Sequence, residues 1–186
     1  RIELMGTMIG NGDKIVGELD GGETRFLLMV RGELHNCFFT IKDPKMPDLP
    51  VVFYLKQSKK PLIKVTFKGN KPVIYLKLFL EGDIAAIQSR INYERPENKE
   101  TLERAFEEIA KNSLDKVIEK CKNMNSDVFG FGDVAVRSFL TIQEWEEYNW
   151  NRHFKDAKIT TEVAFKIKRT GAMIGSSPIV TSGGPE

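Results

Sequence analysis

The sequence is poor in the residues on which many catalytic and metal sites depend. It contains two cysteines and two histidines among 186 residues. Cys37 and Cys121 form no C-x-x-C pair, and neither His35 nor His153 belongs to a recognisable metal-binding pattern. We therefore expect no metal site and no cysteine nucleophile. The two thiols are predicted to be buried, with a single disulfide between them as the alternative.

Long apolar runs and an excess of one charge are also missing. No apolar run is longer than Phe26–Val30, which is far shorter than the ~20 residues that a membrane-spanning helix needs. The 28 basic and 26 acidic residues leave a formal net charge of +2, whereas nucleic-acid-binding domains usually carry a strong basic excess. We expect no transmembrane helix and no nucleic-acid partner. The length suits one domain, predicted over residues 1–175, and small polar residues predict a flexible tail at 176–186.

The first half of the chain has the patterns of β-structure. Asn11-Gly12-Asp13 lies between two apolar runs and predicts a hairpin within residues 1–19. A helix is predicted next, between Asp20 and Gly32, although its five consecutive apolar residues would also suit a buried strand. Turns that contain proline or glycine then separate four expected strands, at 36–42, 51–56, 62–68 and 73–81.

The second half begins with helical spacing. Apolar residues recur every three or four positions between Asn98 and Lys122, which predicts one long helix, and Glu107 and Lys111 on it are spaced as an ion pair. The patterns beyond it predict a short helix at 141–150 and a final strand at 158–169. The expected fold is α+β: an antiparallel β-sheet meander, including the final strand, with the long α-helix and one or two shorter helices packed on it.

One glycine-rich segment has the form of the dinucleotide fingerprint G-x-G-x-x-G/A, namely Gly130-Phe131-Gly132-Asp133-Val134-Ala135. The fingerprint needs a strand directly before it and an acidic residue ~20 residues later, but here a helix precedes it and 151–153 contains no acid. We expect no nucleotide and no other cofactor. Gly130 and Gly132 are expected to allow tight turns, while Phe129 and Phe131 pack into the core.

Carboxylates and tryptophans gather on the predicted short helix. Trp145 and Trp150 are expected either to complete the core or to form an exposed anchor for a partner. The acids beside them suit a solvated helix face. A hydrolase would need two carboxylates to meet in one cleft, drawn from Glu144, Glu146, Glu147, Asp127 and Asp133. We assign no catalytic residue and expect no enzymatic activity.

Lysines dominate the segment from Lys56 to Lys71, which contains no acidic residue. Such a basic hairpin could contact an anionic membrane surface or a partner. The alternative is an edge hairpin that its lysines protect from aggregation. Lys59, Lys60 and Lys64 are the candidates for the partner or membrane contact.

Several segments together carry a family resemblance: Asp13–Leu19, the long helix, Ser126–Gly132, the aromatic residues Trp145, Trp150 and Phe154, and Ile167–Gly171. In this order and spacing they resemble the C-terminal domain of the C-subunit lipoproteins of bacterial spore germinant receptors, the GerAC-like or Ger(x)C family. The resemblance covers the chain from about Gly6 to Gly171.

The resemblance implies a non-catalytic domain of a longer lipoprotein, with a signal peptide, a lipidated cysteine and further domains. It implies a position on the outer face of the spore inner membrane. The implied partners are the A and B type membrane-embedded subunits of a receptor that responds to nutrients. A sensor that binds the nutrient itself remains the alternative, with a hollow between helix and sheet lined by phenylalanine and tryptophan.

Overall fold

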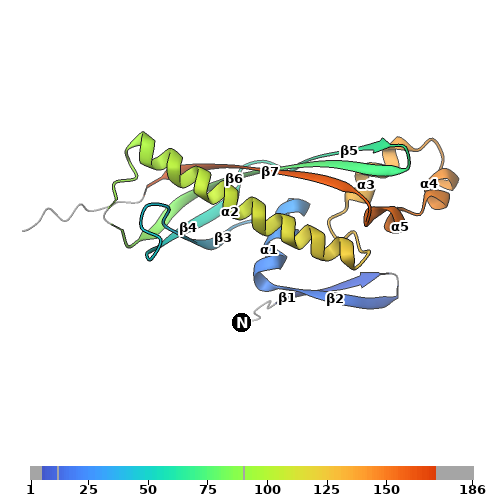
Figure 1. Cartoon of the computed structure of the whole chain (residues 1–186), viewed down its shortest axis with the longest axis horizontal. Coiled ribbons are helices and arrows are strands. Elements are labelled where there is room, and N and C mark those ends of the chain that lie inside the picture. The colour runs from blue at the N-terminus through green and yellow to red at the C-terminus, as the bar shows by residue number, and fades with distance from the viewer. Residues whose placement is uncertain (1–5, 12, 90, 171–186) are drawn as a thin grey trace, which may run out of the picture.

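Five strands form a main sheet, and a two-stranded hairpin lies beside it (Figure 1). The computed structural model describes residues 6–11, 13–89 and 91–170, so the tail predicted at 176–186 lies outside the described residues. The hairpin consists of β1 (Gly6–Asn11) and β2 (Lys14–Asp20). The main sheet consists of β3 (Cys37–Lys42), β4 (Pro50–Gln57), β5 (Leu62–Lys68), β6 (Lys71–Ile87) and β7 (Lys158–Arg169).

The helices are α1 (Gly21–Arg31), α2 (Pro96–Asn123), α3 (Phe131–Ala135), α4 (Ile142–Tyr148) and α5 (Trp150–Phe154). The α+β class is therefore confirmed. The ambiguous apolar run is the helix α1, because Asp20 and Glu23 form a capping box at its start and Gly32 ends it with φ 72°. The helix predicted at 141–150 is two helices, separated by Asn149 with φ 52°.

The strand order differs from a meander in two respects. β4 pairs with β6 and not with β5, because the long strand β6 offers Lys71–Lys77 to β5 and Leu80–Ile87 to β4 along one edge. β7 joins the sheet but runs parallel to β6 on its other edge. The helical segment between β6 and β7 is long enough to return the chain to the same end of the sheet, which short turns cannot do.

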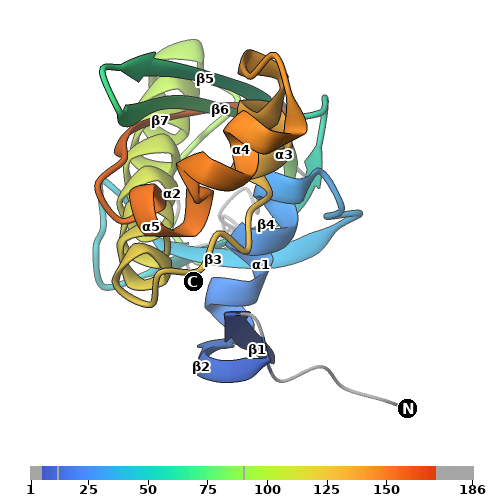
Figure 2. The same cartoon turned by 90° about the vertical axis from the view of Figure 1, so that its right-hand side faces the viewer.

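The helices pack on one face of the main sheet, here called the inner face (Figures 1 and 2). Phe106 of α2 contacts Phe53 of β4 and Phe165 of β7, with ring centroids 5.5 and 4.1 Å apart. Phe26 of α1 packs on Phe39 of β3. In the part of the chain that the structure describes, no helix covers the opposite, outer face.

Two carboxylates of α2 accept hydrogen bonds from the free backbone N–H groups of the edge strand β7. Glu103 accepts the backbone N–H of Ile167 at 2.8 Å, and Glu107 accepts that of Phe165 at 2.8 Å. Glu107 therefore does not form the ion pair with Lys111 that its spacing predicted, and Lys111 pairs with Asp115 instead. Because these bonds occupy donors that an edge strand would otherwise leave free, α2 protects β7 from pairing with another chain.

A buried carboxylate, Asp43, joins the β3–β4 loop to the segment before α2. It accepts hydrogen bonds from Ser89 Oγ at 2.6 Å and Tyr93 Oη at 2.7 Å, and from the backbone of Lys45 and Met46. Burial opposes ionisation of this carboxyl, but the four donors outweigh burial and hold its pKa below the usual range.

Candidate functional site

The glycine-rich segment forms a buried corner between α2 and α3. Asp127 accepts hydrogen bonds from the backbone N–H of Phe131 and Gly132 and from Trp150 Nε1, the last two at 2.7 and 2.8 Å. Phe129 and Phe131 are buried. Gly130 adopts φ 81°, a conformation that favours glycine. A Cβ at Gly132 would lie 3.0 Å from the indole of Trp150, so the sequence Gly-Phe-Gly suits this corner sterically.

Burial shifts the pKa values of the two ionisable groups near the corner, Asp127 and Cys121. Burial raises the pKa of the Asp127 carboxyl, although the N–H groups of Gly132, Trp150 and Phe131 act in the opposite direction. Burial also raises the pKa of the Cys121 thiol to about 12. Cys121 and the half-buried Cys37 are both free thiols, so the alternative of a disulfide between them is excluded.

The candidate carboxylates differ in their contacts. Glu144 accepts the backbone N–H of Leu140 at 3.1 Å, just before the start of α4. Asp133 lies beside Gly130, and Glu146 and Glu147 are exposed on α4. Among residues 6–11, 13–89 and 91–170, no three histidine, cysteine, aspartate or glutamate side chains gather as a metal site would require. Within the same ranges, no helix is long and apolar enough to cross a bilayer.

Aromatic residues gather at the end of the sheet where β5 turns into β6. Phe139 contacts Phe67 of β5 and Trp145 of α4, with ring centroids 5.4 and 5.3 Å apart. The indole of Trp145 stacks on that of Trp150, which is buried, whereas Trp145 is half-buried. We call this set the aromatic end cluster: Phe67, Phe139, Trp145, Tyr148 and Trp150.

Two aliphatic residues that follow Phe139 in the sequence are exposed to solvent. Leu140 is 92% exposed and Ile142 is 59% exposed. Thr141 between them accepts the backbone N–H of Glu144 at 3.2 Å, which fixes the start of α4. We call Leu140 and Ile142 the apolar tip. The sequence analysis missed it, since its signal was two aliphatic residues around a helix-capping threonine.

The space between α2 and the sheet is occupied by side chains. A hollow there, lined by phenylalanine and tryptophan, was the expectation for nutrient binding. Phe53, Phe106 and Phe165 fill that position and are fully buried. An open groove of about 550 Å³ lies elsewhere, between the β1–β2 hairpin and the end of α2, and the ion pair of Glu23 and Lys120 lines it.

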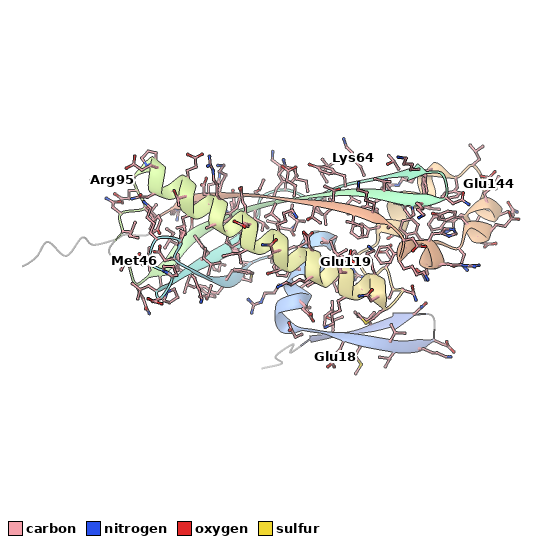
Figure 3. All side chains as sticks on the ribbon, in the orientation of Figure 1. Glu18, Met46, Lys64, Arg95, Glu119 and Glu144 are labelled. Atoms are coloured by element: carbon pink, nitrogen blue, oxygen red, sulfur yellow. The ribbon has the colours of Figure 1, made fainter. Side chains whose placement is uncertain are left out.

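The candidate lysines lie away from the helices. Lys64 of β5 pairs with Tyr75 of the neighbouring strand β6. Figure 3 shows the side chain of Lys64 at the upper margin, on the side away from α2. Lys59 lies over the ring of Phe79 at 5.8 Å, and Lys60 is exposed beside it. The structure therefore places these lysines on a different surface from the apolar tip and the buried corner.

Comparison with known proteins identifies relatives over most of the chain. The family model described as "Spore germination B3/ GerAC like, C-terminal" matches residues 5–171. Spore germination protein KC of Bacillus subtilis (strain 168) is 24% identical over 156 residues, which are 82% of this chain and 37% of that protein.

A solved structure has the same fold. The crystal structure of the GerBC protein superposes with a TM-score of 0.72 at 23% sequence identity, over 86% of this chain and 50% of that one. The chain thus spans half or less of the length of these relatives. With the family model matched over nearly its whole length, the chain belongs to the family of GerAC-like C-terminal domains of spore germination proteins.

Proposed function

We propose that this chain is a non-catalytic domain of a spore germinant receptor C subunit, which docks on the A and B type membrane-embedded subunits and supports germination signalling. The full-length protein would be a lipoprotein on the outer face of the spore inner membrane. Support for the receptor comes from the family and from the names of the relatives. Support for docking comes from one feature of the surface, the apolar tip.

The apolar tip has the properties of a protein contact site. Leu140 and Ile142 are exposed, and the backbone that carries them is held by the packed ring of Phe139 and by the capping bond of Thr141. A preformed backbone reduces the conformational entropy that is lost on association. Exposed apolar patches mark contact sites, and α4 also carries the half-buried Trp145, a residue type that is enriched at the centre of interfaces.

The charges around the tip favour a protein partner over an anionic bilayer. Glu144, Glu146 and Glu147 lie on α4 directly after Ile142. Anionic lipid would repel this helix, whereas a protein surface with basic residues at its rim would attract it. The expected partner surface is therefore an apolar pocket with cationic residues around it.

The test is co-purification of the receptor from spore membranes that carry the double variant L140S/I142S in the full-length protein. We expect the partner subunits to be lost from the purified complex, while the variant keeps its melting temperature. The matched control is M8S/I15S, which removes two aliphatic residues that are 71% and 68% exposed on the β1–β2 hairpin. Retention of the partners by L140S/I142S, or equal loss in both variants, would contradict the docking proposal.

A further inference from the structure

The register of β5, β6 and β7 brings lysines from separate parts of the sequence onto the outer face. Lys64 pairs with Tyr75 and Lys68 pairs with Lys71, while Lys158 pairs with Val73. Residues that pair directly across neighbouring strands lie on the same face of a sheet, and so do alternate residues of one strand. With Lys59 over the ring of Phe79, they make up what we call the lysine face: Lys59, Lys64, Lys68, Lys71 and Lys158.

Two acids of the outer face, Glu81 and Glu162, are already in ion pairs, and Asp83 lies farther along β6, where it pairs in register with Tyr54 of β4. Glu81 pairs with Lys56 at 2.9 Å and with Lys168 at 3.3 Å, and Glu162 pairs with Lys77. Glu162 also accepts a hydrogen bond from Tyr75 Oη at 2.5 Å. The lysine face differs, because its members form no ion pair with any residue that the structure describes. An uncompensated positive charge therefore lies over the β5–β6 end of the sheet.

We propose that the lysine face lies against an anionic phospholipid bilayer. Lysines are mobile point charges that suit a diffuse negative surface, whereas specific carboxylate recognition usually uses the planar fork of arginine. The lysines are exposed and spread over a β-sheet surface, so several can reach headgroups together. Half-exposed apolar and aromatic side chains stand between them, including Leu62 and Tyr75, and can enter the interfacial region.

The apolar tip and the lysine face share no residue, so each can be tested without the other. A bilayer under the lysine face would hold the sheet flat on the membrane. The aromatic end cluster, next to the β5–β6 turn through the bond from Tyr148 Oη to the Asn70 carbonyl, would then meet membrane-embedded partners at the level of the headgroups.

The test is flotation of the chain with vesicles of phosphatidylglycerol and phosphatidylcholine, compared with vesicles of phosphatidylcholine alone. Each lysine near an anionic surface raises the partition coefficient about fivefold at low salt. We expect binding to the anionic vesicles alone, and weaker binding as salt increases. The variant K64Q/K68Q/K71Q/K158Q should bind at least tenfold more weakly, while the arginine variant K64R/K68R/K71R/K158R should bind like the wild type.

A second quadruple variant controls for the loss of charge alone. K14Q/K99Q/K116Q/K155Q removes four lysines that lie outside the lysine face and form no ion pair with the described residues. It should keep most of the binding. Equal loss in both glutamine variants, or failure of the wild type to bind anionic vesicles, would overturn the proposal. The proposal would also be overturned if K64Q/K68Q/K71Q/K158Q still bound vesicles but lost the partner subunits when the receptor is purified from spore membranes. The lysine face would then contact protein.

Discussion

The two faces of the main sheet use the same strands for different purposes. On the inner face, Phe53 and Phe165 pack under Phe106 of α2 without contact with solvent. On the outer face, alternate residues of the same strands carry charges, and at the β5–β6 end these charges are unpaired. Residues that determine the fold and residues that are free to contact partners therefore alternate along each strand. Substitutions on one face should change stability, and those on the other should change binding.

The largest expected effect is on the inner face. Phe106→Ala removes a ring that contacts Phe39, Phe53 and Phe165, and should lower the free energy of unfolding by about 3–5 kcal/mol. Urea denaturation measures this change. The control is Ile109→Ala on the same helix, whose side chain is 37% exposed and whose loss should cost about 1 kcal/mol or less. Similar effects of the two substitutions would contradict the packing described here.

The next effect concerns the corner between α2 and α3. Gly132→Val places a branched side chain against the indole of Trp150 and should destabilise the protein by about 2–3 kcal/mol, with Gly132→Ala intermediate. Thermal unfolding of the three proteins gives the series. The emission of Trp150 should also change, because its bond to Asp127 would be strained. An unchanged melting temperature for the valine variant would contradict the close packing of Gly132 against Trp150.

A smaller, pH-dependent effect on stability is expected at Asp43, a carboxylate that is fully buried. Asp43→Asn should cost about 1–3 kcal/mol at pH 7, since one amide oxygen cannot accept all four donors. The folded-state pKa of Asp43 lies below its unfolded value, so ionised Asp43 stabilises the protein above the unfolded pKa of about 3.9. This stabilisation is lost as the pH falls through the folded pKa. The difference in free energy of unfolding between wild type and variant should therefore shrink below about pH 4. Urea denaturation at pH 7 and pH 3 would measure it. The same difference at both pH values would contradict the stabilising role of ionised Asp43.

The sequence predicts local elements well because their signals are local. The 3.6-residue period of α2 and the period of two in β7 need no knowledge of the rest of the chain, and the strand predicted at 158–169 has these bounds in the structure. The capping box of α1 is likewise written in four consecutive residues, Asp20 to Glu23.

The direction and neighbours of strands are not local properties, and here the prediction was wrong. Alternation in β7 is the same whether it runs parallel or antiparallel to β6, and the length of β6 that lets two strands share one edge appears only after folding. The lysine face depends on the same register. Lys158 lies far from Lys64 in the sequence, so the pattern between Lys56 and Lys71 revealed only part of the surface.

The candidate contact surfaces were partly predictable for the same reason. Lys59, Lys60 and Lys64 stand in a segment without acids, which the sequence shows directly. The exposure of Leu140 and Ile142 is a tertiary property, because it appears only once the neighbouring Phe139 packs on Phe67 and Trp145.

In this account, exposed residues of the domain bind the partner subunits without contributing to its stability. The most direct test is to purify the receptor with the L140S/I142S variant and to measure which partner subunits it retains. The residues lie outside the packed interior, so the domain should stay folded while the membrane-embedded subunits are lost. A receptor that retains its full set of subunits with both aliphatic residues replaced would contradict the account.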